Sequence, residues 1–185
     1  TIHGLNHFTV FILTTPAPDN TQSILINEVL PNPSAGAEWV ELYNNTAGVI
    51  DLSAGTGWTI DSATGAPQSL SALGSIPAGG LVVFEAPAGW LSDTAPETVT
   101  VSNETGAAVD TVTISLTSPG FAVNRYPAAG ESVGRSSNGS SQWIIFTVPT
   151  KGTSNVLAAP GSKSVASTIE AHGFPTWYSD DTGTR

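Results

Sequence analysis

The sequence predicts an all-β domain, either a sandwich or a barrel, and two observations carry that prediction. Short apolar runs of strand length recur along the chain, and clusters of glycine, proline and asparagine separate them. No stretch of helical length keeps the apolar period of a helix without an interrupting glycine or proline. Many short strands with such spacing are typical of sandwiches and barrels.

The expected strands follow one another through the middle of the chain. In order they are Ile24–Leu30, Glu38–Asn44, Gly57–Asp61, Leu81–Glu85, Glu97–Ser102, Ala107–Leu116, Phe121–Tyr126 and Gln142–Val148. The clearest pattern lies near the end of Ala107–Leu116, where Val112, Ile114 and Leu116 alternate with hydroxyl side chains. That alternation predicts a strand with one buried face.

The charge balance and the residue usage exclude several classes of partner and chemistry. The net charge is −10, from 15 acidic against 5 basic residues, so the chain lacks the cations that neutralise nucleic-acid phosphates or anionic lipids. There is no cysteine, which removes disulfides and thiol catalysis. No apolar run is long enough to span a bilayer, and the longest, Phe8–Leu13, has the length of a strand.

We find no constellation of catalytic residues and predict no enzyme activity, no cofactor and no metal site. The histidines His3, His7 and His172 lie in no triad or metal-ligand context, and no phosphate loop or nucleophile elbow occurs. Carboxylates are numerous enough for a glycosidase-like pair, but the spacings indicate no aromatic-lined cleft, so a hydrolase is the weakest of the alternatives. Calcium is compatible with oxygen-rich side chains, but no motif supports it.

Two tryptophans, Trp39 and Trp58, are expected to be buried in the core because both lie among apolar residues in predicted strands. The carboxylates of Glu28, Glu38 and Glu41 surround the first of them in sequence. We expect them to cap turns or to accept hydrogen bonds from the backbone or from Arg135, and a cation site is the less favoured alternative.

A set of short motifs runs in order through residues 24–155. They are Ile26-Asn27-Glu28, the segment Glu38–Asn44, Asp51-Leu52-Ser53, Gly57-Trp58-Thr59-Ile60, Val109-Asp110-Thr111-Val112, Ser132-Val133-Gly134-Arg135 and a closing Pro149–Asn155. In this order and spacing, the set resembles the lamin-tail domain, which is an immunoglobulin-like β-sandwich. The one clear departure is Lys151, where the family usually has proline, and it affects the local turn.

The resemblance implies a structural or binding module without catalytic residues. The family occurs in nuclear lamins and in many secreted bacterial proteins, and this composition is similar to the secreted bacterial type. We therefore expect a secreted or cell-surface location. The chain divides into an N-terminal strand and spacer (1–23), the lamin-tail-like sandwich (24–155) and a C-terminal tail (156–185), of which some is expected to pack on a partner surface.

The N-terminal strand is the most apolar in the chain, with apolar side chains on both faces, which indicates burial on both sides. Its apolar residues are Phe8, Val10, Phe11, Ile12 and Leu13. It precedes a spacer with two prolines, Pro16 and Pro18, which is semi-stiff and extended. The strand could extend its own sheet, belong to a preceding domain, or pair with another copy by donor-strand addition.

We favour the third placement, because so apolar a strand aggregates unless something buries it, and lysine, the usual edge-blocking residue, is scarce. The expected function is therefore a subunit of a surface fibre or filament that self-associates through the N-terminal strand. The alternative is an adhesion or glycan-binding accessory module of a larger secreted protein.

Overall fold

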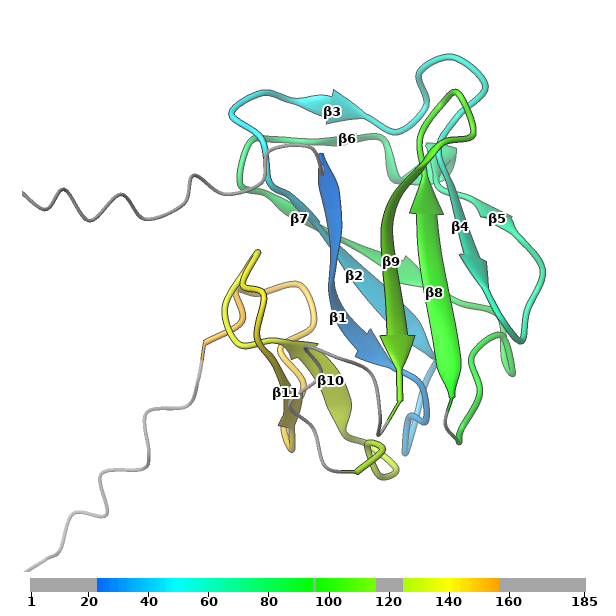
Figure 1. The fold of residues 1–185 in the computed structure, drawn as a ribbon, viewed down its shortest axis with the longest axis vertical. Helices are drawn as coiled ribbons and strands as arrows, with labels where there is room; N and C mark the ends of the chain where they lie inside the picture. Colours follow the sequence, from blue (N-terminus) through cyan, green and yellow to red (C-terminus); the bar gives the residue numbers. More distant parts are fainter. Residues whose placement is uncertain (1–22, 95, 116–124, 157–185) are drawn as a thin grey trace, which may run out of the picture.

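The computed structural model describes residues 23–94, 96–115 and 125–156, which are almost entirely strands and turns (Figure 1). The elements are β1 (Ile24–Leu30), β2 (Trp39–Asn44), β3 (Ile50–Asp51), β4 (Thr59–Ser62), β5 (Gln68–Ser69), the 3-10 turn η1 (Ser71–Leu73), β6 (Ser75–Ile76), β7 (Leu81–Glu85), β8 (Glu97–Ser102), β9 (Ala108–Ile114), β10 (Ser132–Arg135) and β11 (Trp143–Phe146). No helix within the described residues is long and apolar enough to cross a membrane.

Two antiparallel sheets face each other across the core. The large sheet has the strand order β11-β10-β1-β2-β7, and the small sheet has the order β5-β4-β8-β9. β1 packs against β9 and β8 of the small sheet, and Figure 1 shows these green strands beside the dark blue β1. The pair β3-β6 forms a separate two-stranded ribbon. The predicted immunoglobulin-like β-sandwich is confirmed.

The predicted alternation in β9 is confirmed by the burial pattern up to Ile114, and Leu116 lies outside the described residues. Val112 and Ile114 are buried in the core, whereas Thr111 is exposed. The outward hydroxyl of Thr111 lies 3.2 Å from that of Thr100 on β8, a cross-strand contact that favours this register. The turn between the two strands contains Gly106 at φ 79°, a left-handed conformation that favours glycine.

Both predicted core tryptophans are buried, but only Trp58 lies in the core between the two sheets. Trp58 is 5% exposed and belongs to the cluster between the sheets. Trp39 is 2% exposed but lies outside that cluster, whereas its neighbour Val40 belongs to it. Because side chains alternate along a strand, Trp39 occupies the outer face of the large sheet. Something other than the small sheet must therefore cover it.

The sequence located most strands but missed some. β1, β7 and β8 have the predicted bounds, and β2, β4, β9 and β11 differ at their ends. β10 was expected only as a motif, and the two-residue strands β3, β5 and β6 were not expected, because so short a strand has no periodicity to detect. Most of the predicted strand Phe121–Tyr126 lies outside the described residues.

Candidate functional site

The outer face of the large sheet is organised around a β-bulge in β1. Ile26 pairs with Leu42 and Glu28 with Glu41, so Asn27 is the extra residue. A bulge takes backbone groups out of the ladder, and they need other partners. Here the N–H of Ile26 donates to Asp110 Oδ2 at 2.8 Å, and its carbonyl accepts from Arg135 Nε at 2.8 Å.

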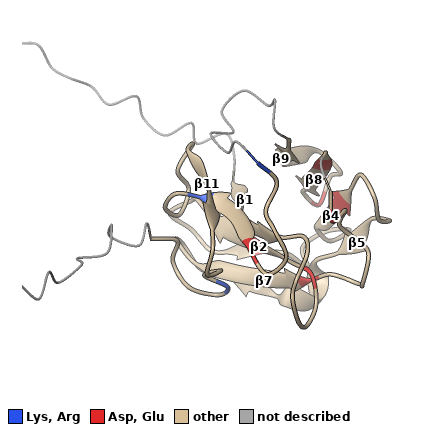
Figure 2. Ribbon diagram, turned by 90° about the horizontal axis from the view of Figure 1, so that it is seen from below, with Lys and Arg blue, Asp and Glu red and all other residues tan. Residues whose placement is uncertain are grey.

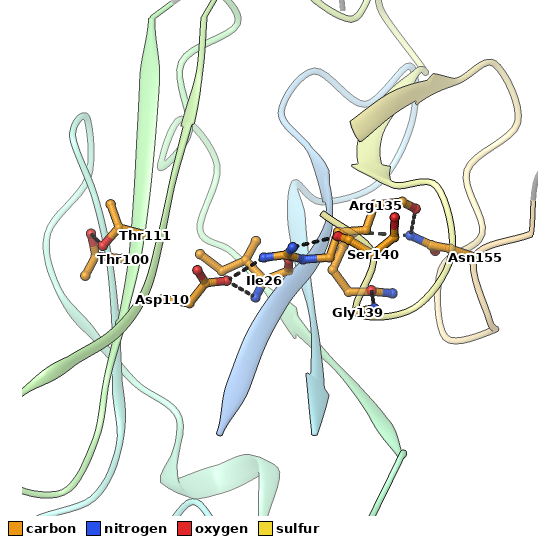
Figure 3. Close-up of polar contacts among 9 residues, drawn as sticks. Ile26, Thr100, Asp110, Thr111, Arg135, Gly139, Ser140 and Asn155 are labelled. Atoms are coloured by element: carbon orange, nitrogen blue, oxygen red, sulfur yellow. Dashed lines mark hydrogen bonds and ion pairs between the residues drawn. The ribbon is translucent and has the colours of Figure 1, made fainter. Parts of the chain in front are cut away.

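Asp110 and Arg135 therefore join the two sheets at the bulge. Asp110 lies on β9, and its Oδ2 accepts from Arg135 Nη2 at 3.1 Å, with both side chains nearly inaccessible. Figure 3 shows the guanidinium extending from β10 toward Asp110, with Ser140 on its other side. The same guanidinium lies 5.0 Å from the ring centroid of Trp143 on β11. The ion pair thus holds β9, β10 and β11 together.

The residues 147–156, called here the closing segment, cross this outer face and are held by carboxylates. The N–H of Thr150 donates to Glu28 Oε1 at 3.0 Å, and the N–H of Gly152 donates to Glu41 Oε2 at 2.7 Å. The hydroxyl of Thr150 also donates to Glu28. Two buried acids of adjacent strands therefore bind the backbone of one loop.

Asn155 fixes the far end of the closing segment. Its Nδ2 donates to the carbonyls of Asn27 at 3.1 Å and Arg135 at 2.7 Å (Figure 3 shows the Arg135 side). Gly134 makes room for this contact, because a Cβ there would lie 2.9 Å from the carbonyl of Asn27 and 3.1 Å from the Asn155 amide. The bulge residue Asn27 also donates to Glu41 Oε1 at 2.9 Å, so the bulge contacts both Asn155 and the carboxyl that binds Gly152.

Burial changes the titration of Glu41. Desolvation, assisted by the nearby charge of Glu28 and opposed by the hydrogen bonds from Asn27 and Gly152, raises the pKa of this carboxyl to about 7. The segment is therefore held by a carboxyl that titrates close to neutral pH.

The expected role of the clustered carboxylates is confirmed in part. Glu38 accepts from the N–H groups of Gly89 at 2.8 Å and Leu91 at 2.6 Å, so Glu38, like Glu28 and Glu41, serves as an acceptor for backbone donors. The backbone is thus the donor to all three, whereas Arg135, the other donor considered, donates to Asp110 and to the carbonyls of Ile26 and Ser140. Among the described residues, no three His, Cys, Asp or Glu side chains are grouped to hold a metal ion.

β11 is the last strand of the large sheet within the described residues, and this edge is the candidate site for binding. Its sequence is Trp143-Ile144-Ile145-Phe146, without a charge. Beside it lies a groove of about 370 Å³, and its described lining residues are all apolar or hydroxyl-bearing: Ile144, Ile145, Phe146, Thr147, Val148, Thr150 and Val156. The closing segment thus supplies one wall of this groove.

The opposite edge of the large sheet differs in charge. β7 ends at Glu85, whose carboxylate accepts from Lys151 Nζ at 2.6 Å, with both side chains exposed. That lysine lies 5.9 Å from the ring centroid of Trp39, which explains how the closing segment helps to cover the outer tryptophan. Figure 2 shows that charged segments are few and are separated by long uncharged stretches of the ribbon.

The predicted self-assembly residues Phe8, Val10, Phe11, Ile12 and Leu13 lie outside the described residues. The acceptor side was not predicted from the sequence. A run of four large apolar residues in β11 was the available signal, but the run alone does not tell an edge strand from a central one.

The glycan-binding alternative finds no aromatic platform in the described part of the chain. Sugar rings stack on exposed aromatic faces, but Trp39, Trp58, Trp90 and Trp143 are each at most 5% exposed. These rings hold the fold together and do not face solvent.

A comparison with protein families gives one match. The family model described as Lamin Tail Domain matches residues 17–126, more than half of the chain. The match ends before β10, β11 and the closing segment, so the candidate edge lies beyond it. No curated protein matches the chain.

Proposed function

Because the chain belongs to the lamin-tail domain family, whose members are immunoglobulin-like structural domains, we propose that it is a non-catalytic structural module of an extracellular or cell-surface assembly. In this proposal, copies of the chain associate into a fibre or filament. The N-terminal strand of one copy adds to the sheet of the next, and the contact repeats from head to tail.

The observation that carries the proposal is the uncharged, apolar edge at β11. Sheet edges in natural proteins are protected by charges, prolines, bulges or covering segments, because an open edge pairs with other strands. β11 consists of large apolar residues, and a groove lies beside it. The same chain contains an apolar strand, Phe8–Leu13, that needs burial on two sides.

The non-catalytic part of the proposal is supported by what the buried carboxylates do. Glu28, Glu38 and Glu41 each accept hydrogen bonds from backbone N–H groups, and Asp110 is paired with Arg135. An acid engaged in this way holds loops and strands in place. Substituting one of them should change stability and not uncover a hydrolytic role.

The test is the state of association of the purified full chain. We expect sedimentation velocity to show large species that grow with concentration, and negative-stain electron microscopy to show fibres. Substituting Phe11→Asp should place a charge in the buried joint and leave monomers, whereas Thr21→Asp, the same charge in the spacer, should assemble as the wild type does. A wild-type chain that stays monomeric at all concentrations would contradict the proposal.

A further inference from the structure

The two faces of β11 are both apolar, but different parts of the molecule cover them. Trp143 belongs to the core cluster, and Ile145 packs against it, so these residues occupy the inner face. By alternation, Ile144 and Phe146 occupy the outer face, beside the closing segment. Ile144 and Ile145 are only partly buried. Ile144 on the outer face and Ile145 on the inner face are thus the two apolar side chains of this edge that remain partly exposed.

The closing segment makes the outer part of this surface into a groove. Val148 is 78% exposed and Val156 is 63% exposed, and they are two of the three large apolar side chains that lie exposed among the described residues. Both line the groove beside β11. Scattered exposed valines need no explanation, but two that line one groove beside an apolar edge strand form a continuous patch.

The wall is fixed in place by the contacts described above. Thr150 is bound by Glu28, Gly152 by Glu41 and Asn155 by the bulge. These bonds lie between Val148 and Val156 in sequence, so they set where both valines stand. The groove is thus a built feature, because buried polar residues hold its wall against the sheet.

The occupant must be apolar on both faces, and the chain contains such a segment. Phe8, Val10 and Ile12 share one face of an extended strand, and Phe11 and Leu13 lie on the other. A strand added at β11 presents one face to the outer groove and the other to the inner surface beside Ile145. The segment is joined to Ser23, the first described residue, by a spacer that contains Pro16 and Pro18.

We infer that the edge of β11, together with the wall formed by Val148 and Val156, is the acceptor site for residues 8–13 of a second copy of the chain. The inference rests on the proposed function and adds the place of the joint. The proline-containing spacer favours a second copy over the chain's own edge, because proline restricts the backbone to extended conformations that carry the strand away from its own domain.

Disulfide trapping tests the assignment without interference, because the chain has no cysteine of its own. One full-length chain carries Ile12→Cys and a second carries Ile144→Cys, and the two are mixed under mild oxidation. We expect a disulfide-linked heterodimer. The matched control replaces Ile144→Cys by Val83→Cys, a partly buried aliphatic position on β7 at the opposite edge of the same sheet, and should leave the chains unlinked.

Several outcomes would overturn the inference and leave different parts of the account in place. If the chains form fibres but link equally well through Val83→Cys, the acceptor is elsewhere and the proposed function stands. If Ile144→Cys chains link mainly to one another, two β11 edges pair directly. An intrachain bond in an Ile12→Cys/Ile144→Cys double variant assigns the strand to its own sheet, and one in Ile144→Cys/Phe174→Cys assigns the groove to the C-terminal tail.

Discussion

The two edges of the large sheet differ in the charged side chains that they carry. At β7 the edge carries an exposed ion pair between Glu85 and Lys151, and the lysine also covers Trp39. β11 itself carries no charge, and Arg135, on the neighbouring strand β10, is turned inward to Asp110 and the ring of Trp143. Within the described part of the chain, the sheet thus has one edge that carries charges and one that does not.

The difference shows how a chain with few cations distributes them. Only five residues are lysine or arginine, so the position of each one decides which sheet edge carries a positive charge. A flexible lysine at an edge discourages pairing with other strands, whereas a buried arginine leaves its edge free to pair. Arg135 lies on the strand next to β11, but it is engaged in holding the two sheets together and places no charge at that edge.

The largest losses of stability should come from removing the ring of Trp39, on the strand next to β7, or that of Trp143, on β11. Trp39→Ala and Trp143→Ala should each lower the free energy of unfolding by about 3–5 kcal/mol, the usual range for large aromatic residues buried in a core. Urea unfolding checks this, with Val49→Ala at an exposed site as the control. If either tryptophan variant lost no more free energy of unfolding than the control, the burial of that tryptophan would be contradicted.

Breaking the buried ion pair near β11 should be nearly as costly. Asp110→Ala leaves Arg135 charged and buried and also removes the acceptor for the N–H of Ile26, so we expect a loss of about 3–5 kcal/mol. Asp61→Ala, at an exposed position on β4, is the control. The double variant Asp110→Leu/Arg135→Met should lose less than Asp110→Ala, and an equal or larger loss would show that the charge itself is not the cause.

The sequence predicts the sandwich well but does not predict the network around the bulge. Val112 and Ile114 could be assigned to a buried face because they alternate within one strand. Asp110 and Arg135 could not be paired, because they are far apart in sequence and their contact depends on a bulge that shifts the register at Asn27. Likewise, the sequence around Ile144 predicts a core strand, and only the strand order shows that this strand lies at the edge of the sheet.

The carboxyl of Glu41 should give the closing segment a dependence on pH. Its pKa is about 7 in the folded chain, above the ordinary value of 4.5, so the folded state binds the proton more tightly than the unfolded state does. The stabilisation is fully present below pH 4.5 and is lost as the pH rises to about 7. Unfolding measured across this window should show stability falling with pH, and Glu41→Gln should flatten the slope. A wild-type slope of the opposite sign would contradict this assignment.

The smallest effect is expected at the edge that carries charges. Lys151→Ala removes an exposed ion pair, and such pairs contribute little to folding because water solvates both charges well. We expect the urea midpoint to stay within error of the wild type. A loss comparable to that of Asp110→Ala would mean that the two edges do not differ as the structure indicates.

The most direct test of the account compares the same charge at the two edges. Ile144→Lys places a lysine on β11, and Val83→Lys places one on β7, each at a partly buried aliphatic position. The account predicts that both variants fold, by circular dichroism and urea unfolding. It predicts that sedimentation velocity finds Ile144→Lys monomeric at concentrations where the wild type and Val83→Lys assemble. Assembly that survives in Ile144→Lys, or that is lost only in Val83→Lys, would contradict the claim that the chain assembles through β11.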